Sequence, residues 1–242
     1  MTQNQPPRPL SPNRRAWLRF KANRRGYISL WIFSALFIVS LFAEILSNDK
    51  PLIVHYQGDY YFPLIRSYPE TTFGGDFETE ADYNDSFLME RLSTAGNWVW
   101  YAPNRYSHES INYAAEHPNP APPSSLNLLG TDDRGRDVLA RLIYGFRLSV
   151  LFAFVLTVVA TLLGIAAGAL QGYLGGRFDL YSQRAIEVWS SMPELYLLII
   201  FSSIFQPSVL LLVILLPLFG GMGLADYVRA EFLRGRAMDY VK

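Results

Sequence analysis

Long, nearly uninterrupted apolar blocks are the feature that most constrains this chain. The first block covers residues 27–46, and three more follow at residues 148–171, 185–205 and 209–224. A helix of about 20 apolar residues is long enough to cross the ~30 Å hydrocarbon core of a bilayer. Hydrophobic residues make up 50% of the chain, and their gathering into blocks is typical of membrane proteins. The sequence therefore predicts an all-α membrane protein with four transmembrane helices.

The residues before the first apolar block predict its orientation. Residues 1–26 end in a cluster of Lys and Arg side chains between Arg14 and Arg25. Because basic residues favour the cytoplasmic side, this segment is predicted to be a cytoplasmic tail. The apolar core of residues 27–46 is longer than that of a signal peptide, and no convincing cleavage site follows it. We therefore interpret it as an uncleaved first transmembrane helix, with Glu44 near its outer end and without a functional role.

A polar segment separates the first apolar block from the other three. Residues 47–129 are rich in Pro, Gly, Asn, acidic and aromatic residues and hold no run long enough to span a membrane. They are predicted to form a mixed periplasmic insertion, with a short strand at residues 97–101. Its acidity either faces a binding-protein surface or only keeps the segment solvated. The chain has no cysteine, and its three His residues lack metal-ligand spacing, so we expect no metal site and no cofactor.

Residues 130–147 form a charged motif that leads into the second apolar block. Apolar side chains from Val138 to Phe146 fall on one face of a helix, which Thr131 or Asp132 can cap. Asp137 and Arg141 stand in the favourable i, i+4 order. We interpret the segment as an interfacial helix on the periplasmic side; an amphipathic helix of a soluble domain is the alternative. The candidate residues of this lead-in motif are Gly130, Thr131, Asp132, Gly135, Arg136, Asp137, Arg141, Gly145 and Arg147.

Two features inside the apolar blocks suggest specific contacts. Gly164 and Gly168 form a GxxxG pattern, which indicates a face for close packing against another helix or subunit, or simple tolerance of glycine. A short loop at residues 173–183 is expected to lie in the cytoplasm. In the third block, Glu194 follows Pro193, and a carboxylate inside a membrane needs a partner or water. Glu194 therefore either lines the substrate path, where it meets a cationic cargo group or takes up a proton, or makes a polar contact with another subunit.

Four motifs in a fixed order carry a family resemblance. GTDDRGRD, ARLIYGFRLS, GYLGGRFD and RAIEVWSSMP, within residues 130–242, resemble the C-type inner-membrane permeases of bacterial dipeptide and oligopeptide ABC importers. The acidic insertion is most similar to that of microcin C-type peptide importers. The resemblance implies a type I importer permease fold, in which residues 130–242 form the N-terminal part of the transmembrane domain. It also implies transport by alternating access, in which ATP binding to partner subunits switches the permease between inward-facing and outward-facing states.

The same resemblance implies the partners and the location. They are a second homologous permease, two cytoplasmic ATPase subunits or domains, a periplasmic solute-binding protein, a peptide substrate and the lipid bilayer of the bacterial inner membrane. The basic amphipathic segment 225–242 is expected to be cytoplasmic, with coupling residues Arg229, Arg234, Arg236 and Tyr240. The family's coupling loop would begin at about Lys242. We therefore expect four of about six spans and a chain that is a fragment or is truncated.

Other functions remain open on the sequence alone. No G-x-x-x-x-G-K-[ST] motif occurs, so ATP is not expected to bind through a P-loop, and no nucleophile–base arrangement points to an enzyme. Lys and Arg number 21, as do Asp and Glu, so net charge points to no partner and no nucleic acid is expected. A membrane receptor with an acidic periplasmic sensor domain, a membrane-embedded enzyme subunit, and an importer of nickel or another non-peptide solute are the alternatives.

Overall fold

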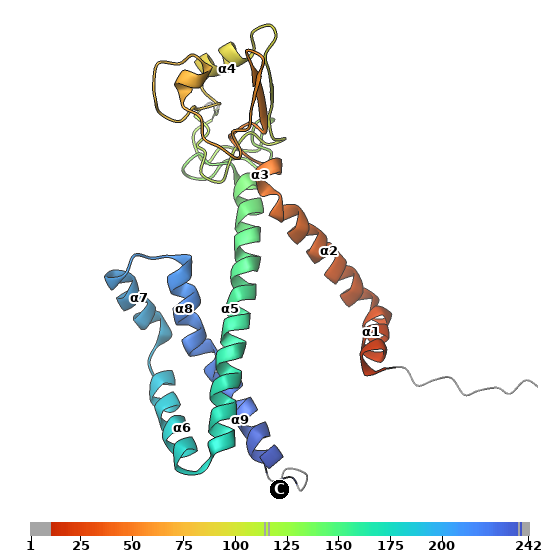
Figure 1. Ribbon diagram of the computed structural model, residues 1–242, viewed down its shortest axis with the longest axis vertical. Helices are drawn as coiled ribbons and strands as arrows, with labels where there is room; N and C mark the ends of the chain where they lie inside the picture. Colours follow the sequence, from red (N-terminus) through yellow and green to blue (C-terminus); the bar gives the residue numbers. More distant parts are fainter. Residues whose placement is uncertain (1–10, 114, 116, 237, 239–242) are drawn as a thin grey trace, which may run out of the picture. The chain divides into compact units, whose positions relative to one another are not determined.

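The computed structural model of the chain describes residues 11–113, 115, 117–236 and 238 (Figure 1). It divides into two compact units, Met1–Arg147 and Leu148–Lys242. By length and composition, α2 (Arg24–Leu41) and α5 (Val138–Leu174) are each able to cross a membrane. The number of candidate spans rises to four among the described residues if two bent helix pairs each count as one span.

The first unit starts with a short helix joined directly to the first candidate span. In α1 (Pro12–Ala22), Ser11 caps the N-terminus, and Asn23 separates α1 from α2. The predicted tail is therefore helical from Pro12 onwards. Within the predicted first span, residues 27–46, the Phe42 amide bonds back to the Val39 carbonyl and interrupts the helix between α2 and α3 (Ala43–Leu46).

The insertion contains a small antiparallel sheet of order β2-β1-β3. Its strands are β1 (Ile53–Tyr56), β2 (Asp59–Tyr61) and β3 (Trp98–Trp100), so the short strand predicted from the sequence is confirmed. The η1 turn (Glu70–Phe73) and α4 (Ser86–Leu92) pack on one side of this sheet. The insertion thus contains both strands and helical turns, in agreement with the mixed structure predicted for it.

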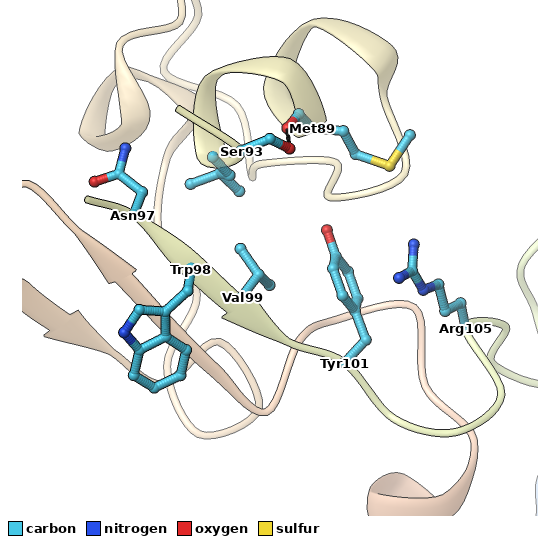
Figure 2. Close-up of a pocket in the computed structure, with 8 residues that line it drawn as sticks. Met89, Ser93, Asn97, Trp98, Val99, Tyr101 and Arg105 are labelled. Carbon is cyan, nitrogen blue, oxygen red and sulfur yellow. Dashed lines mark hydrogen bonds between the residues drawn. The ribbon is translucent and has the colours of Figure 1, made fainter. Parts of the chain in front are cut away.

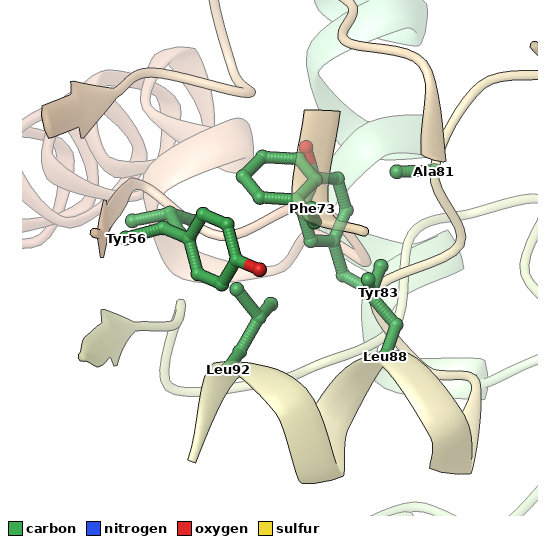
Figure 3. Packing of buried hydrophobic residues seen from close by; sticks show 7 residues of the cluster. Tyr56, Phe73, Ala81, Tyr83, Leu88 and Leu92 are labelled. Carbon is green, nitrogen blue, oxygen red and sulfur yellow. The ribbon is translucent and has the colours of Figure 1, made fainter. Parts of the chain in front are cut away.

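An aromatic core holds the insertion together. Phe73 is fully buried, and its ring meets those of Tyr56, Tyr61 and Tyr83 edge to face at centroid distances of 5.6, 5.2 and 5.7 Å. Figure 3 shows Leu88 and Leu92 of α4 reaching toward this cluster. Burying a large side chain of this kind stabilises a domain by roughly 1.5–3 kcal/mol. The insertion therefore has a core of its own.

The second unit contains the rest of α5 and four further helices. They are α6 (Gly176–Ser190), α7 (Glu194–Ile204), α8 (Val209–Gly220) and α9 (Met222–Arg236). α5 has 37 residues and is therefore about 55 Å long. The segment predicted as a separate interfacial helix is instead the first part of this one continuous helix. The loop predicted at residues 173–183 is mostly helical as well, because only Gly175, with φ +61°, separates α5 from α6.

The last two predicted spans are both broken. The predicted helix 185–205 is divided between α6 and α7, which meet at a bend of 76°. Pro193 lacks an amide hydrogen and has an extended backbone, so α6 stops before it and α7 starts after it. The predicted helix 209–224 ends as α8 at Gly220, and α9 continues beyond a bend of 44°. α9 thus begins at Met222, three residues before the basic amphipathic segment predicted at residues 225–242.

Candidate functional site

A glycine-rich turn builds the start of the lead-in motif. Gly130 and Gly135 have φ angles of +76° and +80°, which side chains rarely tolerate. A Cβ atom at Gly135 would lie 2.6 Å from the Asn119 side chain. Thr131 donates a hydrogen bond to Asn119 Oδ1 at 2.7 Å and accepts one from the Ala121 amide at 2.8 Å. These glycines are therefore required by the fold of the turn.

Asp132 ties this turn together through its carboxylate. It accepts hydrogen bonds from the Arg134 and Arg136 amides, both at 2.9 Å, and from the guanidinium groups of Arg136 and Arg141. Desolvation opposes its charge, but the backbone and side-chain bonds from Arg136, with those from Arg134 and Arg141, outweigh it. The pKa of Asp132 is therefore held well below its ordinary value. Arg141 pairs with Asp132, so the predicted Asp137–Arg141 pair is wrong.

The stabilisation by Asp132 is expected to depend on pH. Because its pKa is lower in the folded chain than the unfolded value of about 3.9, its contribution is complete above that value and is lost as pH falls toward the folded pKa. The difference in thermal midpoint between the wild type and Asp132→Asn should therefore be largest at neutral pH and shrink progressively as the pH falls below about 4. The exposed Asp76, changed to Asn, is the control and should show no difference. A difference that stays constant with pH would contradict this assignment.

Asp137 is the N-cap of α5, in place of Thr131 or Asp132. Its carboxylate accepts a hydrogen bond from the Ala140 amide at 2.7 Å, and its side chain is fully buried. Two asparagines complete its shell: Asn104 donates at 2.8 Å and Asn127 at 2.9 Å. Asn127 in turn accepts a bond from Asn112 at 2.6 Å. We call Asp137, Asn104, Asn127 and Asn112 the buried polar network; it joins three parts of the insertion to the start of α5.

A second set of contacts joins the end of the first span to α5. Arg147 binds Glu44 through two hydrogen bonds of 2.8 Å each, and the Tyr144 hydroxyl donates to the Ser47 carbonyl at 2.9 Å. The rings of Phe33 and Phe146 meet at 5.7 Å. A bidentate Arg–carboxylate pair fixes orientation as well as distance. Glu44 is therefore the partner of Arg147, a role that its position in the sequence did not reveal.

Breaking the Glu44–Arg147 pair is expected to lower stability. The side chains are 41% and 24% exposed, so we expect Glu44→Gln or Arg147→Met to lose about 1–2 kcal/mol, between the values for exposed and buried pairs. The exchange Glu44→Arg with Arg147→Glu should recover part of this loss, as measured by the thermal midpoint of the full chain in detergent. A double variant no more stable than either reversed single variant, Glu44→Arg or Arg147→Glu, would contradict the pairing.

Glycines on one face of α5 let α9 approach closely. A Cβ atom at Gly164 would lie 2.7 Å from the Gly221 carbonyl oxygen, one at Gly168 would lie 2.8 Å from Val228 Cβ, and one at Gly172 would lie 2.8 Å from the Arg229 carbonyl oxygen. Each step of four residues along α5 thus meets the next turn of the α8–α9 segment. We call these three glycines the α5 glycine stripe. The packing interpretation of the GxxxG pattern is confirmed, with a partner in the same chain.

The predicted coupling residues are mostly engaged within the second unit. Arg229 forms a bidentate pair with Asp179 of α6, one bond being 2.7 Å long. Arg236 donates to the Tyr173 carbonyl at 3.3 Å, near the end of α5. Arg234 is exposed and pairs with Glu231 at 3.5 Å on the same helix. Tyr240 lies outside the described residues. Arg229 and Arg236 therefore join α9 to α5 and α6.

Glu194 is the first residue of α7, at the bend between α6 and α7. It is exposed, and the first turn of a helix favours a negative charge. Glu187, on the other side of the bend, pairs with Arg184 of the same helix at 2.6 Å. The sequence placed Glu194 inside a continuous span, whereas the break at Pro193 puts it at a helix end. The predicted roles of Glu194 stay predictions.

The insertion also contains an open pocket of about 260 Å³ (Figure 2). Met89 of α4 and Ser93, which follows the end of this helix, form one wall, and Trp98 and Val99 of β3 form another. Arg105 lies over the Tyr101 ring at 4.1 Å. Nothing in the sequence pointed to this pocket, because its walls come from segments without a shared motif. Among the described residues, no group of three or more His, Cys, Asp or Glu side chains is placed to hold a metal ion.

Comparisons with known proteins agree with this architecture. Residues 11–68 match the family described as the N-terminal transmembrane domain of oligopeptide transport permease C. Residues 160–242 match the inner membrane component of binding-protein-dependent transport systems. The second match covers the glycine stripe and the helices packed on it. The predicted fold class, a helical importer permease with a mixed insertion after its first span, is confirmed.

Individual relatives extend the match over almost the whole chain. The chain is 53% identical to the inner membrane ABC transporter permease protein YejE of Escherichia coli K12, over 96% of its own length and 68% of the relative's. It is 44% identical to the peptidoglycan transport system permease protein YejE of Agrobacterium fabrum, over 98% and 68%. The dipeptide transport system permease protein DppC of Bacillus subtilis is 34% identical over 50% of this chain and 38% of its own length. The chain therefore belongs to the family of inner-membrane permease subunits of ABC transporters that includes YejE.

Proposed function

We propose that this chain forms part of the path by which peptides cross the bacterial inner membrane in an ATP-driven importer. The observation that carries the proposal is the 53% identity to an ABC transporter permease over 96% of the chain, together with more distant similarity to dipeptide and oligopeptide permeases. The chain is the transport subunit, and ATP hydrolysis belongs to separate ATPase subunits.

The proposed assembly contains a second homologous permease, two ATPase subunits and a periplasmic binding protein. The basic residues around α1 support a cytoplasmic N-terminus. With that orientation the insertion lies in the periplasm, where its acidic surface is available to the binding protein. The segment from Arg229 to Tyr240 then belongs to the cytoplasmic side, where it faces the ATPases.

The packing of α5, α6 and α9 supports a mechanical role. The glycine stripe holds α9 on α5, and the Asp179–Arg229 pair joins α9 to α6. Three helices held in this way move together, as alternating access requires of a permease. A force applied near Arg236 would thus be passed to the C-terminal half of α5, where the glycine stripe lies.

Glu194 is proposed to face the transport path. It stands exposed at a helix break within an apolar segment, an arrangement that is found where broken helices line cavities. A carboxylate there would attract the amino terminus or a basic side chain of a peptide. Contact with another subunit is the second possible role, and Glu194→Gln separates the two. A loss of uptake limited to cationic peptides supports the path, whereas a loss of assembly supports the contact.

A second candidate cargo is the peptide-bearing fragment of peptidoglycan. It is favoured by the A. fabrum relative, which is named for peptidoglycan transport and matches 98% of this chain. Both cargoes contain a peptide, so the same path is suited to either. Competition between a free tripeptide and a peptidoglycan fragment decides which binds better.

Reconstitution tests the function directly. The full-length permease with its partner subunits is placed in vesicles, and uptake of a labelled tripeptide is measured with and without ATP. ATP-dependent uptake that needs the binding protein supports the proposal, and the permease alone should hydrolyse no ATP. Uptake of nickel without peptide uptake would assign a different cargo. Ligand binding to the insertion without any uptake would support a receptor instead.

A further inference from the structure

The helix before the first span has an unusual charge pattern. From Ser11 to Arg25 the chain contains no acidic residue. The basic side chains in this stretch are Arg14, Arg15, Arg19, Lys21, Arg24 and Arg25. Ser11 accepts a hydrogen bond from the Arg14 amide at 3.4 Å, and Pro12 occupies the first helical turn, so α1 has a defined start. A strongly basic helix of this kind is attracted to a negatively charged surface.

Aromatic contacts fix α1 against the beginning of α2. The Trp17 ring stacks on Phe20 at 5.7 Å and meets Tyr27 at 6.4 Å, and Tyr27 meets Trp31 at 6.2 Å. Lys21 lies over the Trp17 ring at 5.6 Å. We call Trp17, Phe20, Tyr27 and Trp31 the aromatic belt. It holds α1 beside the end of the span, so α1 is not a freely moving tail.

The hinge between the two helices is a single residue. The Asn23 amide closes the end of α1 with bonds to the Arg19 and Phe20 carbonyls, and its side chain accepts a bond from the Gly26 amide of α2 at 3.3 Å. Because α2 is a candidate span, α1 must lie where that span leaves the hydrocarbon. This position at the membrane surface does not depend on which end of the span faces the cytoplasm.

We propose that α1 and the N-terminal turns of α2, up to Trp31, form a binding surface for the anionic headgroups of phospholipids. The basic side chains meet the phosphates, while Leu18 and the belt residues Trp17 and Trp31 reach the boundary with the acyl chains. These three apolar side chains are 48%, 46% and 58% exposed, although they are large. Basic and aromatic residues on one short helix are typical of binding to an anionic membrane surface. The surface orients the first span in the bilayer and is independent of the transported cargo.

A single label can report this contact, because the chain contains no cysteine. Leu18→Cys carries a spin label, and the full chain is reconstituted into vesicles with or without phosphatidylglycerol. The accessibility of the label to oxygen and to a water-soluble quencher then gives the fraction of labels that are buried in the bilayer and the fraction that are exposed to water. Vesicles with the same lipid in both leaflets make the result independent of orientation.

Charge removal supplies the decisive comparison. Arg14→Gln with Arg19→Gln should lower the ratio of membrane-buried to water-exposed label roughly 25-fold in anionic vesicles, since each basic residue near such a surface contributes about fivefold. Arg66→Gln with Arg134→Gln removes the same charge from exposed positions elsewhere in the chain and should leave the ratio unchanged. High salt should reproduce the loss by screening.

Three outcomes would overturn the proposal. The label could be equally buried in neutral and anionic vesicles, which would show that α1 touches the bilayer through its apolar side chains and does not bind anionic headgroups. It could be exposed to water in both, so that α1 does not touch lipid. It could become protected only when the ATPase subunits are added, which would assign the basic helix to a protein partner. None of these results would affect the measurement of peptide uptake.

Discussion

Replacing Gly168 by alanine is expected to separate α5 from α9 and to reduce transport strongly. A methyl group at this position would lie 2.8 Å from Val228 Cβ and 3.0 Å from the Arg229 amide nitrogen, and would also strike the Ala225 carbonyl. Backbone atoms cannot rotate away, so the helices themselves must move. Overpacking of this kind typically destabilises a protein by about 1–3 kcal/mol, and in lipid no hydrophobic effect draws the two helices together again.

The matched control for Gly168→Ala is Gly223→Ala. Gly223 lies in α9, and a Cβ atom there would meet nothing within 4 Å. The same added methyl group should therefore leave the thermal midpoint unchanged or raise it slightly, because alanine favours helix more than glycine does. The measurements are the thermal midpoint of the full permease and ATP-dependent peptide uptake by the complete importer. Gly168→Leu should be more severe than Gly168→Ala. Equal behaviour of Gly168→Ala and Gly223→Ala would refute a close α5–α9 contact.

The sequence predicted what local composition controls. Apolar blocks located the candidate spans, the GxxxG pattern predicted a packing face at Gly164 and Gly168, and alternation predicted the strand that the structure shows as Trp98–Trp100. Each of these signals is contained in one short stretch of chain. The family resemblance, supported by motifs from Gly130 onwards, added the architecture that periodicity alone does not determine.

Contacts between distant residues could not be read in the same way. Glu44 pairs with Arg147 across 103 positions, and Asp179 pairs with Arg229 across 50. Nothing in either neighbourhood identifies the partner, so Glu44 received no role. The predicted bounds of the helices differ from the structure for another reason. A long apolar run hides the break at Pro193, because hydropathy averages over the residues on both sides and does not register a missing amide hydrogen.

The lead-in motif at residues 130–147 shows what its sequence predicts and what only the folded turn determines. Its charged residues suggested a capped amphipathic helix, and a helix does follow, but the cap is Asp137. Asp132 was an equally good cap by residue type. It instead closes the turn, because the Arg134 and Arg136 amides and two guanidinium groups converge on it. Only the fold of the turn distinguishes the two carboxylates.

Replacing Asp137 by asparagine is expected to disconnect the insertion from α5. The Asp137 carboxylate has only acceptors and receives three donors: the Asn104 and Asn127 side-chain amides and the Ala140 backbone amide. An asparagine has one oxygen, so its own NH₂ group must face at least one of these donors. Leaving a buried polar group without a partner costs about 1–3 kcal/mol, and more for a charged hydrogen bond. Because the side chain is fully buried, water cannot replace the lost partner.

Proteolysis and thermal unfolding of the full chain measure this effect of Asp137→Asn. The insertion should be cleaved faster and the thermal midpoint should fall, since Asn104 and Asn127 lose the group that holds them to the start of α5. Asp133→Asn is the control: this neighbouring acid is exposed, so the same change should have no effect. If Asp137→Asn behaved like Asp133→Asn, the network would not hold the insertion. The double variant Asn127→Asp with Asp137→Asn exchanges donor and acceptor across the 2.9 Å bond between these two side chains. If Asp137→Asn lowered stability and the double variant restored it, the stability would depend on the pairing of a donor with an acceptor and not on the charge at position 137.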